Sequence, residues 1–284
     1  MEKLTIGEVL ADISSKAAQA AEATPEDSQD YTVDGLRYCG KCRTPKQLIL
    51  TPPGMVVSCM CSCESEKYRQ EREEERRKDQ IQKVARMREV GFPDAEMARY
   101  TFDLDDQKNP ELSKLCRNYV DRFQDFLKRG KGLLLYGPTG TGKTFLAACI
   151  SNALIDQGIP CLNTNFTRLT NAISGTYEGK QEFIDGLRQF QLLVIDDLAA
   201  ERDTEYMGEM VYSIIDARYR QRLPLIVTSN LTAQELKNPE QMRRQRVFSR
   251  IFEMCVPFEV KGADRRRQIL RDNHEEDRKL LGLR

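Results

Sequence analysis

From residue 92 onward, short apolar runs alternate with longer stretches of mixed polarity. Five of the runs have the length of buried strands, and the stretches between them are long enough for helices. The predicted strands are 131–136, 160–163, 192–196, 224–229 and 256–260. Because buried strands that alternate with helices usually form parallel sheets covered on both faces, the pattern predicts an α/β domain over residues 92–284, built on a five-stranded parallel sheet.

The chain before residue 92 divides into three segments of different character. Residues 1–35 are acidic, with weak amphipathic helix character over 4–21, and predict a helical or flexible segment. Residues 36–64 are rich in cysteine, and residues 65–91 are dense in helix formers and in charge pairs four residues apart. The last segment predicts one long exposed helix that ends at Gly91. A spacer helix is favoured over a coiled coil, because apolar residues at heptad spacing are missing from its first half.

A glycine-rich loop follows the first predicted strand and opens a helical run. It fits the pattern GxxxxGK[ST], in which glycines let backbone N–H groups curl around phosphate oxygens and the helix N-terminus adds positive charge. The matching residues are Gly137, Pro138, Thr139, Gly140, Thr141, Gly142, Lys143 and Thr144. We therefore expect Lys143 to reach the β- and γ-phosphates of ATP and the Thr144 hydroxyl to coordinate Mg²⁺.

Polar residues end the third and fourth predicted strands. Asp196 and Asp197 follow four apolar residues, at the strand end where open α/β sheets bind ligands. Asp196 is the predicted Mg²⁺ partner, and Asp197 is predicted to orient or deprotonate the attacking water. Such an acidic pair can also simply cap a helix. Asn230 follows the strand at 224–229, where a polar residue can hold that water beside the γ-phosphate.

Arginines are frequent after the fourth predicted strand. Arg246 and Arg250 are expected on one face of a helix whose other face is apolar. An arginine delivered to the γ-phosphate of a neighbouring subunit would stabilise the transition state, and the protein would then work as an oligomer. A solvated basic face and a nucleic-acid patch are the alternatives. Arg265 follows the last strand, where it can contact the nucleotide or a nucleic-acid phosphate.

Five of the nine cysteines form a cluster with the spacing of a zinc site. A Cys-x-x-Cys pair and a Cys-x-Cys-x-Cys run are separated by 16 residues, and two thiolate pairs can hold Zn²⁺ tetrahedrally. The predicted ligands are Cys39, Cys42, Cys61 and Cys63, with Cys59 as the alternative. The metal would replace a core that so small a module cannot form, and the residues between the pairs would form a hairpin. An iron–sulfur cluster and free packing thiols are the alternatives, and the other four cysteines are predicted to be buried.

Composition narrows the class of protein further. The 44 Lys+Arg balance the 44 Asp+Glu, but residues 1–36 carry eight acidic against two basic residues, and residues 243–284 carry twelve basic against seven acidic ones. The acidic end suits a protein partner and the basic end suits phosphate. A single histidine excludes a Cys2His2 finger and argues against a Ser-His-Asp triad. No membrane span or signal peptide is evident, so we expect a cytoplasmic protein with no membrane partner.

These motifs resemble the DnaC/DnaI-type helicase loaders and the related IstB-type transposition ATPases of the AAA+ class. The segments that carry the resemblance are 136–144, 192–198, 201–219, 224–231, 249–253 and 262–265. The resemblance implies that Lys143 and Thr144 contact nucleotide and Mg²⁺ and that Asp196 and Asp197 are the acidic pair. It also implies that Asn230 senses the γ-phosphate, that Arg250 is an arginine finger acting in trans, and that Arg265 is a second sensor acting in cis.

The resemblance further implies contact with single-stranded DNA. Residues 163–169 occupy the position at which such proteins carry a DNA-contacting helix, with an ordinary surface helix as the alternative. The candidate contacts are Thr164, Asn165, Phe166 and Arg168, because polar side chains suit phosphate and an aromatic ring suits base stacking. Residues 99–102 are similar to a linker that packs near the adenine.

Taken as a whole, the resemblance implies a slow ATPase that uses ATP, Mg²⁺ and structural Zn²⁺. Its N-terminal zinc module would grip a DnaB-type replicative helicase, which the ATP-bound homo-oligomer would load onto single-stranded DNA. The alternatives are an IstB-type ATPase that assists a transposase and a non-hydrolysing adaptor that uses ATP only as an assembly switch. The zinc module favours the loader, since it is not expected in the IstB branch.

Overall fold

The computed structural model describes residues 29–50, 54–174, 179–198, 204–239, 241–265, 278, 280 and 281. The chain divides into two compact units, Met1–Ile81 and Gln82–Arg284. The weak helix predicted over 4–21 lies outside the described residues. Within the described part of the chain, none of the helices combines the length and the apolar character that crossing a bilayer requires.

Two short antiparallel hairpins lie among the described residues of the first unit. In one hairpin β1 (Tyr31–Val33) pairs with β2 (Leu36–Tyr38), and in the other β3 (Gln47–Leu50) pairs with β4 (Met55–Ser58). The second hairpin confirms the one predicted between the cysteine pairs.

The apolar core of the first unit is very small. Among its described residues the buried cluster consists of Leu36 and Tyr38, with Tyr31 and Val33 packed against it. The rings of Tyr31 and Tyr38 stack with centroids 5.7 Å apart. A core of this size cannot by itself offset the conformational entropy of ordering the described hairpins.

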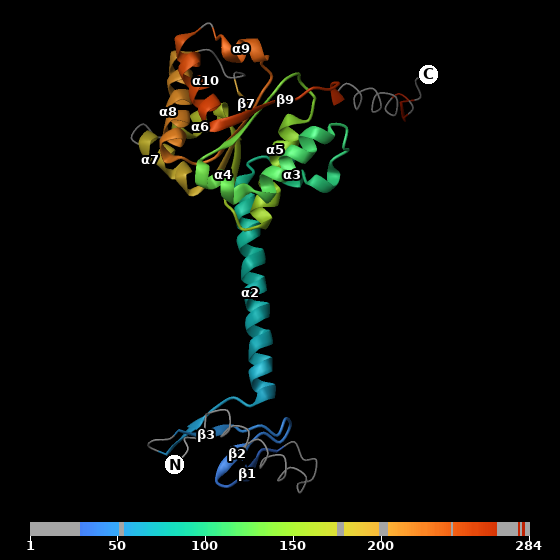
Figure 1. Ribbon diagram of the computed structural model, residues 1–284, viewed down its shortest axis with the longest axis vertical. Helices are drawn as coiled ribbons and strands as arrows, with labels where there is room; N and C mark the ends of the chain where they lie inside the picture. The colour runs from blue at the N-terminus through green and yellow to red at the C-terminus, as the bar shows by residue number, and fades with distance from the viewer. Residues whose placement is uncertain are drawn as a thin grey trace. The chain divides into compact units, whose positions relative to one another are not determined.

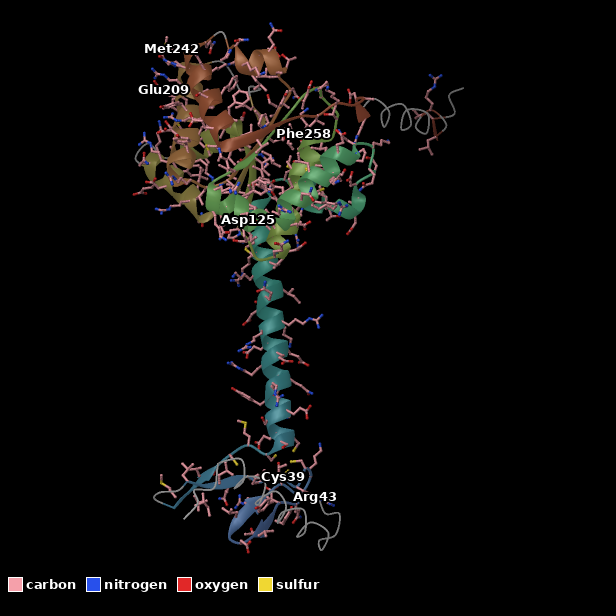
Figure 2. All side chains as sticks on the ribbon, in the orientation of Figure 1. Cys39, Arg43, Asp125, Glu209, Met242 and Phe258 are labelled. Carbon is pink, nitrogen blue, oxygen red and sulfur yellow. The ribbon has the colours of Figure 1, made fainter. Side chains whose placement is uncertain are left out.

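The long helix expected from composition is α2 (Ser62–Gly91), which begins three residues before the predicted start at residue 65. Its charged side chains project from the helix along most of its length (Figure 2), and some form ion pairs three or four residues apart. In the second unit, Val84 and Met87 pack against the core, and Arg88 forms an ion pair with Asp156. The last turns of α2 are therefore anchored to the second unit.

Five parallel strands form the sheet of the second unit, as predicted. They are β5 (Gly132–Tyr136), β6 (Cys161–Asn165), β7 (Leu192–Leu198), β8 (Leu225–Ser229) and β9 (Cys255–Glu259). Their order across the sheet is β6-β7-β8-β5-β9, with every neighbouring pair parallel. Strand β5 therefore lies inside the sheet, between β8 and β9, and the glycine-rich loop follows it at the carboxyl ends of the strands.

Strand boundaries differ from the prediction by one or two residues. The largest differences arise where polar residues continue a strand. Thr164 and Asn165 extend β6 because they pair with Ile195 and Asp196 of β7. Strand β7 continues past both acids to Leu198, through a register shift against β8. The polar residues ended the local apolar pattern, but backbone pairing with the neighbouring strand continued.

Helices cover both faces of the sheet (Figure 1). Along β5, Leu134 belongs to one hydrophobic cluster and Leu133 and Leu135 to the other, as alternation across a strand requires. The first face packs against α8 (Glu205–Gln221) and α10 (Met242–Met254), and the second against α3 (Pro110–Asp121) and α5 (Lys143–Asp156). The other elements are η1 (Met97–Arg99), η2 (Phe102–Leu104), α4 (Phe123–Arg129), α6 (Phe166–Ser174), α7 (Lys180–Gly186), η3 (Leu187–Gln189) and α9 (Ala233–Lys237).

A buried arginine that the sequence pattern did not single out joins several of these elements. Arg218 on α8 is 1% exposed, and its guanidinium donates to the carbonyls of Pro224, Leu187, Phe190 and Gln191. Burial lowers the pKa of Arg218 to about 10, so the group stays charged at neutral pH. Its hydrogen bonds hold the end of α8 to the segments that lead into β7 and β8.

Candidate nucleotide and zinc sites

The glycine-rich loop joins β5 to α5 in a conformation that depends on its glycines. Gly140 and Gly142 have φ of +77° and +93°, a region that side chains with a Cβ rarely adopt. A Cβ at Gly140 would also overlap the Asp264 carboxylate. The loop therefore curls directly into the N-terminus of α5, which begins at Lys143. This is the strand–loop–helix setting that phosphate binding requires.

Lys143 lies across the mouth of the loop. Its Nζ donates to the carbonyl oxygens of Gly137 at 2.8 Å and Pro138 at 2.7 Å, and to Asn230 Oδ1 at 2.9 Å. The side chain is thereby held in the loop, and phosphate oxygens can compete for the same ammonium hydrogens. The contact with Asn230 joins the phosphate loop to the end of β8.

The two predicted acids lie beside Lys143 and Thr144. The Thr144 hydroxyl donates to Asp196 Oδ1 at 2.7 Å, and Asn230 Nδ2 donates to Asp197 Oδ1 at 2.6 Å. A hydroxyl and a carboxylate at this separation are the hard oxygen ligands that Mg²⁺ prefers, so both residues fit the predicted metal role. The structure thus brings together residues that lie up to 87 positions apart in the chain.

A pocket of about 590 Å³ surrounds these groups. Its phosphate side is formed by the loop, the acids and Asn230, and its other side by residues between Asp94 and Lys108. There the Tyr100 and Phe145 rings lie 5.1 Å apart. Asn152 of α5 donates to the carbonyls of Met97 and Tyr100, which holds this segment against the pocket. Of the segment at 99–102, Tyr100 therefore borders the pocket, which agrees with the predicted position near the adenine.

Arg265 also borders the pocket. Its guanidinium lies 3.3 Å from the position that a Cβ on Gly142 would occupy, and its backbone N–H donates to the Gly140 carbonyl. An ion pair of 2.9 Å joins it to Asp106, which lies across the pocket. The position agrees with a nucleotide contact in cis, while the Asp106 partner was not predicted because the two residues lie far apart in the chain.

Arg250 lies on α10 and is absent from the residues that line the described pocket. Its guanidinium forms an ion pair of 2.6 Å with Asp216 and lies over the rings of Tyr212 and Tyr219. Contacts with Tyr212 and Asp216 raise its pKa above the usual value. A charged arginine held in one orientation away from its own phosphate loop suits delivery to another subunit.

Replacing Arg250 with Ala is expected to leave ATP binding unchanged and to lower turnover by about 10³-fold, the smallest effect typical of an arginine finger. Steady-state hydrolysis measured at a concentration that supports oligomers tests this. Arg246→Ala is the matched control, because Arg246 is exposed on the same helix. Mixing Arg250→Ala with Lys143→Ala subunits should restore part of the activity. Normal turnover in Arg250→Ala would contradict the assignment.

Four of the five N-terminal cysteines converge in the first unit, where Cys39 is labelled in Figure 2. The sulfur atoms of Cys39, Cys42, Cys61 and Cys63 all lie within 4.8 Å of one another. The Cys39 and Cys61 sulfurs lie 3.7 Å and 3.4 Å from that of Cys63. Zn–S bonds of tetrahedral geometry place sulfurs roughly 3.8 Å apart, so the four thiols fit a zinc ion.

The fifth cysteine of the cluster stands apart from this group. Cys59 Sγ donates to the Pro45 carbonyl at 3.4 Å and is not among the four clustered thiols. The positions of the sulfur atoms therefore agree with the favoured set of four, whose binding of zinc stays a prediction. The remaining cysteines are buried, as predicted, and burial raises the pKa of each thiol: Cys116, Cys149, Cys161 and Cys255.

The electrostatics of the four thiols also favour a cation. Burial raises the pKa of Cys42, but hydrogen bonds with Thr44 and Cys63 outweigh it and lower the value to about 5. Hydrogen bonds with Cys61 and Cys42 raise the pKa of Cys63 to about 12. Ionisation is thus favoured at Cys42 and disfavoured at Cys63. Four thiolates at these distances require a cation between them.

The predicted DNA segment needs a correction. Phe166 is 2% exposed and packs in the core, and Thr164 is 8% exposed within β6, so neither side chain is available for DNA contact. The reason is that α6 starts directly after β6, which turns Phe166 toward the sheet. Asn165 is half-buried and accepts the Arg168 N–H at 2.9 Å, while Arg168 itself is exposed. Arg168 alone remains an exposed candidate.

The sheet order, the glycine-rich loop and the acids beside it define a P-loop nucleotide-binding protein of the AAA+ class. Within that class the chain belongs to the IstB-like ATP-binding proteins, whose family model matches residues 64–271.

Three comparisons place the chain among its relatives. It is 24% identical to the replicative helicase loader DnaI of Bacillus subtilis over 67% of this chain and 66% of that protein. It is also 24% identical to the phage-like element PBSX protein XkdC of Bacillus subtilis, over 93% of this chain and 96% of that one. A crystal structure of the DnaC helicase loader superposes with a TM-score of 0.51 at 25% identity, covering 59% of this chain and 99% of that one. The chain thus spans just under two thirds of the DnaI relative.

Proposed function

We propose that this protein is an ATPase that loads a ring-shaped replicative helicase onto single-stranded DNA. The observation that carries the proposal is that one chain holds both a pocket lined by the glycine-rich loop, the two acids and Asn230, and a separate cluster of four cysteines. The similarity to proteins named as replicative helicase loaders supports it. ATP binding and hydrolysis by the second unit would control loading, and the cysteine module would bind the helicase.

In the nucleotide site, loop N–H groups and Lys143 bind the phosphates of ATP. Thr144 and Asp196 would hold Mg²⁺, which neutralises phosphate charge when bound. Asp197 lies beside Asn230, and together they orient a water molecule toward the γ-phosphate. Because Lys143 also contacts Asn230, a bound γ-phosphate would be detected both by the loop and by the residue that follows β8.

The second hairpin of the cysteine module supports a partner-binding role. Four apolar side chains of β3 and β4 are about half exposed: Ile49, Leu50, Met55 and Val56. Apolar side chains gathered on one exposed hairpin usually mark a protein-binding surface. We propose that this hairpin contacts the helicase, and that zinc holds it in shape.

Contact with single-stranded DNA is proposed for the exposed side of α6. Thr167, Arg168 and Asn171 are exposed there, opposite the buried Phe166 and Leu169. These polar side chains suit phosphate contact. Arg168→Glu should therefore lower the affinity for single-stranded DNA, measured in the presence of ATP, without changing the affinity for ATP.

Co-purification separates the loader from the alternative of a transposase assistant. The tagged protein is expected to retain the hexameric replicative helicase of its host, and to retain no IS21-type transposase. Met55→Asp/Val56→Asp should reduce helicase retention at least 10-fold, while the control Thr32→Asp, on the first hairpin, should not. Retention of the transposase alone would favour the transposition role and reject the loader.

A further inference from the structure

Thr228 occupies a buried position between the two acids of the nucleotide site. It lies on β8 and is 2% exposed. Its hydroxyl donates to Asp196 Oδ1 at 2.6 Å and accepts the backbone N–H of Asp197 at 2.9 Å. One hydroxyl group therefore joins the carboxylate of one acid to the backbone of the next.

The backbone at Asp197 explains why this hydroxyl is needed. The pairing of β7 with β8 shifts register between Ile195 and Leu198, so Asp197 lies outside the regular ladder. Its φ is +59°, in the left-handed region that residues with a Cβ rarely adopt. At this shift the Asp197 backbone N–H donates to the Thr228 hydroxyl, so a side chain of β8 takes the place of a regular ladder contact.

This local geometry decides where both carboxylates point. The left-handed turn at Asp197 directs its side chain to Asn230 Nδ2 at 2.6 Å, rather than along the strand. At Asp196, Oδ1 accepts the hydroxyls of both Thr144 and Thr228, which fixes the rotation of the carboxylate beside the phosphate loop. Removing the Thr228 hydroxyl would loosen both acids together.

We infer that Thr228 is a positioning residue that sets the orientation of the metal-holding carboxylate and of the water-orienting acid at once. The inference deepens the proposed ATPase function and rests on it. The β-branched side chain also suits a strand, but strand propensity alone requires no hydroxyl at this position. Valine has the same shape without the hydroxyl, and serine keeps the hydroxyl without the methyl group.

The test compares Thr228→Val and Thr228→Ser with the natural protein. Thr228→Val is expected to raise the Mg²⁺ concentration for half-maximal ATP binding by about 10-fold and to lower kcat by a similar factor, the effect usual for residues that orient metal ligands. Nucleotide affinity measured in EDTA should change less than twofold, because the phosphate loop is untouched. Thr228→Ser should restore most of the Mg²⁺ dependence and of kcat.

Two results would overturn the inference. One is an unchanged Mg²⁺ dependence in Thr228→Val. The other is an equal defect in Thr228→Ser, which would assign the effect to packing of the methyl group. If the natural protein hydrolyses no ATP under any condition, the proposed ATPase function fails, while the Mg²⁺ dependence of binding still decides the role of Thr228. Thermal unfolding of each variant reports whether the fold is intact.

Discussion

Replacing Lys143 with Ala is expected to weaken ATP binding by roughly 10²–10⁴-fold. The ammonium group is the charged donor of the phosphate loop, and it already lies within 2.9 Å of three oxygen acceptors at its mouth. Hydrogen bonds to charged groups contribute about 1.5–3 kcal/mol each, so the loss of two phosphate contacts costs about 3–6 kcal/mol. Isothermal titration with ATP and Mg²⁺ measures this directly.

Lys128→Ala is the matched control for this variant, because Lys128 is exposed on α4 and does not line the pocket. It should bind ATP like the natural protein. The melting temperature without nucleotide should be compared for both variants, since Lys143 also donates to loop carbonyls. An ATP affinity within threefold of the natural protein in a folded Lys143→Ala variant would contradict the assignment of the phosphate site.

Removal of zinc is expected to unfold the hairpins of the first unit. Structural zinc supplies about 10–16 kcal/mol of apparent binding free energy at neutral pH, and the buried apolar cluster of this unit has only Leu36 and Tyr38 at its centre among the described residues. The protein should contain one zinc ion per chain by elemental analysis. Chelation should abolish the dispersed amide signals of the hairpins and leave ATP affinity unchanged, since the described nucleotide pocket lies within the second unit.

Two cysteine variants separate a metal site from ordinary thiol packing. Cys39→Ser should lose the metal and the hairpin signals, while Cys59→Ser should keep both, because the Cys59 sulfur stands outside the tetrad. Metal retention in Cys39→Ser, or equal loss in Cys59→Ser, would show that the ligand set is wrong. Zinc should also be released as pH falls, because protons compete for the thiolates.

The features predictable from sequence were those encoded by neighbouring residues. The residues of the glycine-rich loop, of each buried strand and of each cysteine pair lie within a few positions of one another. Their spacing alone therefore predicts a phosphate loop, a strand or a pair of metal ligands. The four favoured cysteines do cluster, with Cys59 outside the group, and their role as zinc ligands stays a prediction. The helix ending at Gly91 was likewise predicted from local signals.

Contacts between distant segments were beyond the local pattern. Three contacts that join separate elements were not predicted. They are the ion pair between Asp106 and Arg265, the ion pair between Asp216 and Arg250, and the hydrogen bonds from Arg218 to backbone carbonyls. The wrong prediction of DNA contact for Phe166 has the same origin. An aromatic residue between a strand and a helix can either stack with a base at the surface or pack in the core, and the local sequence is the same in both cases. Only the packing of α6 on the sheet decides between them.

The central claim is tested most directly by transfer of the host's hexameric helicase onto a single-stranded DNA circle coated with single-strand-binding protein. Helicase bound to the circle is measured after gel filtration, with the natural protein or with Lys143→Ala. The account predicts that the natural protein with ATP increases loaded helicase at least 10-fold over helicase alone, and that Lys143→Ala gives no increase. Equal loading with and without the natural protein in ATP would contradict it.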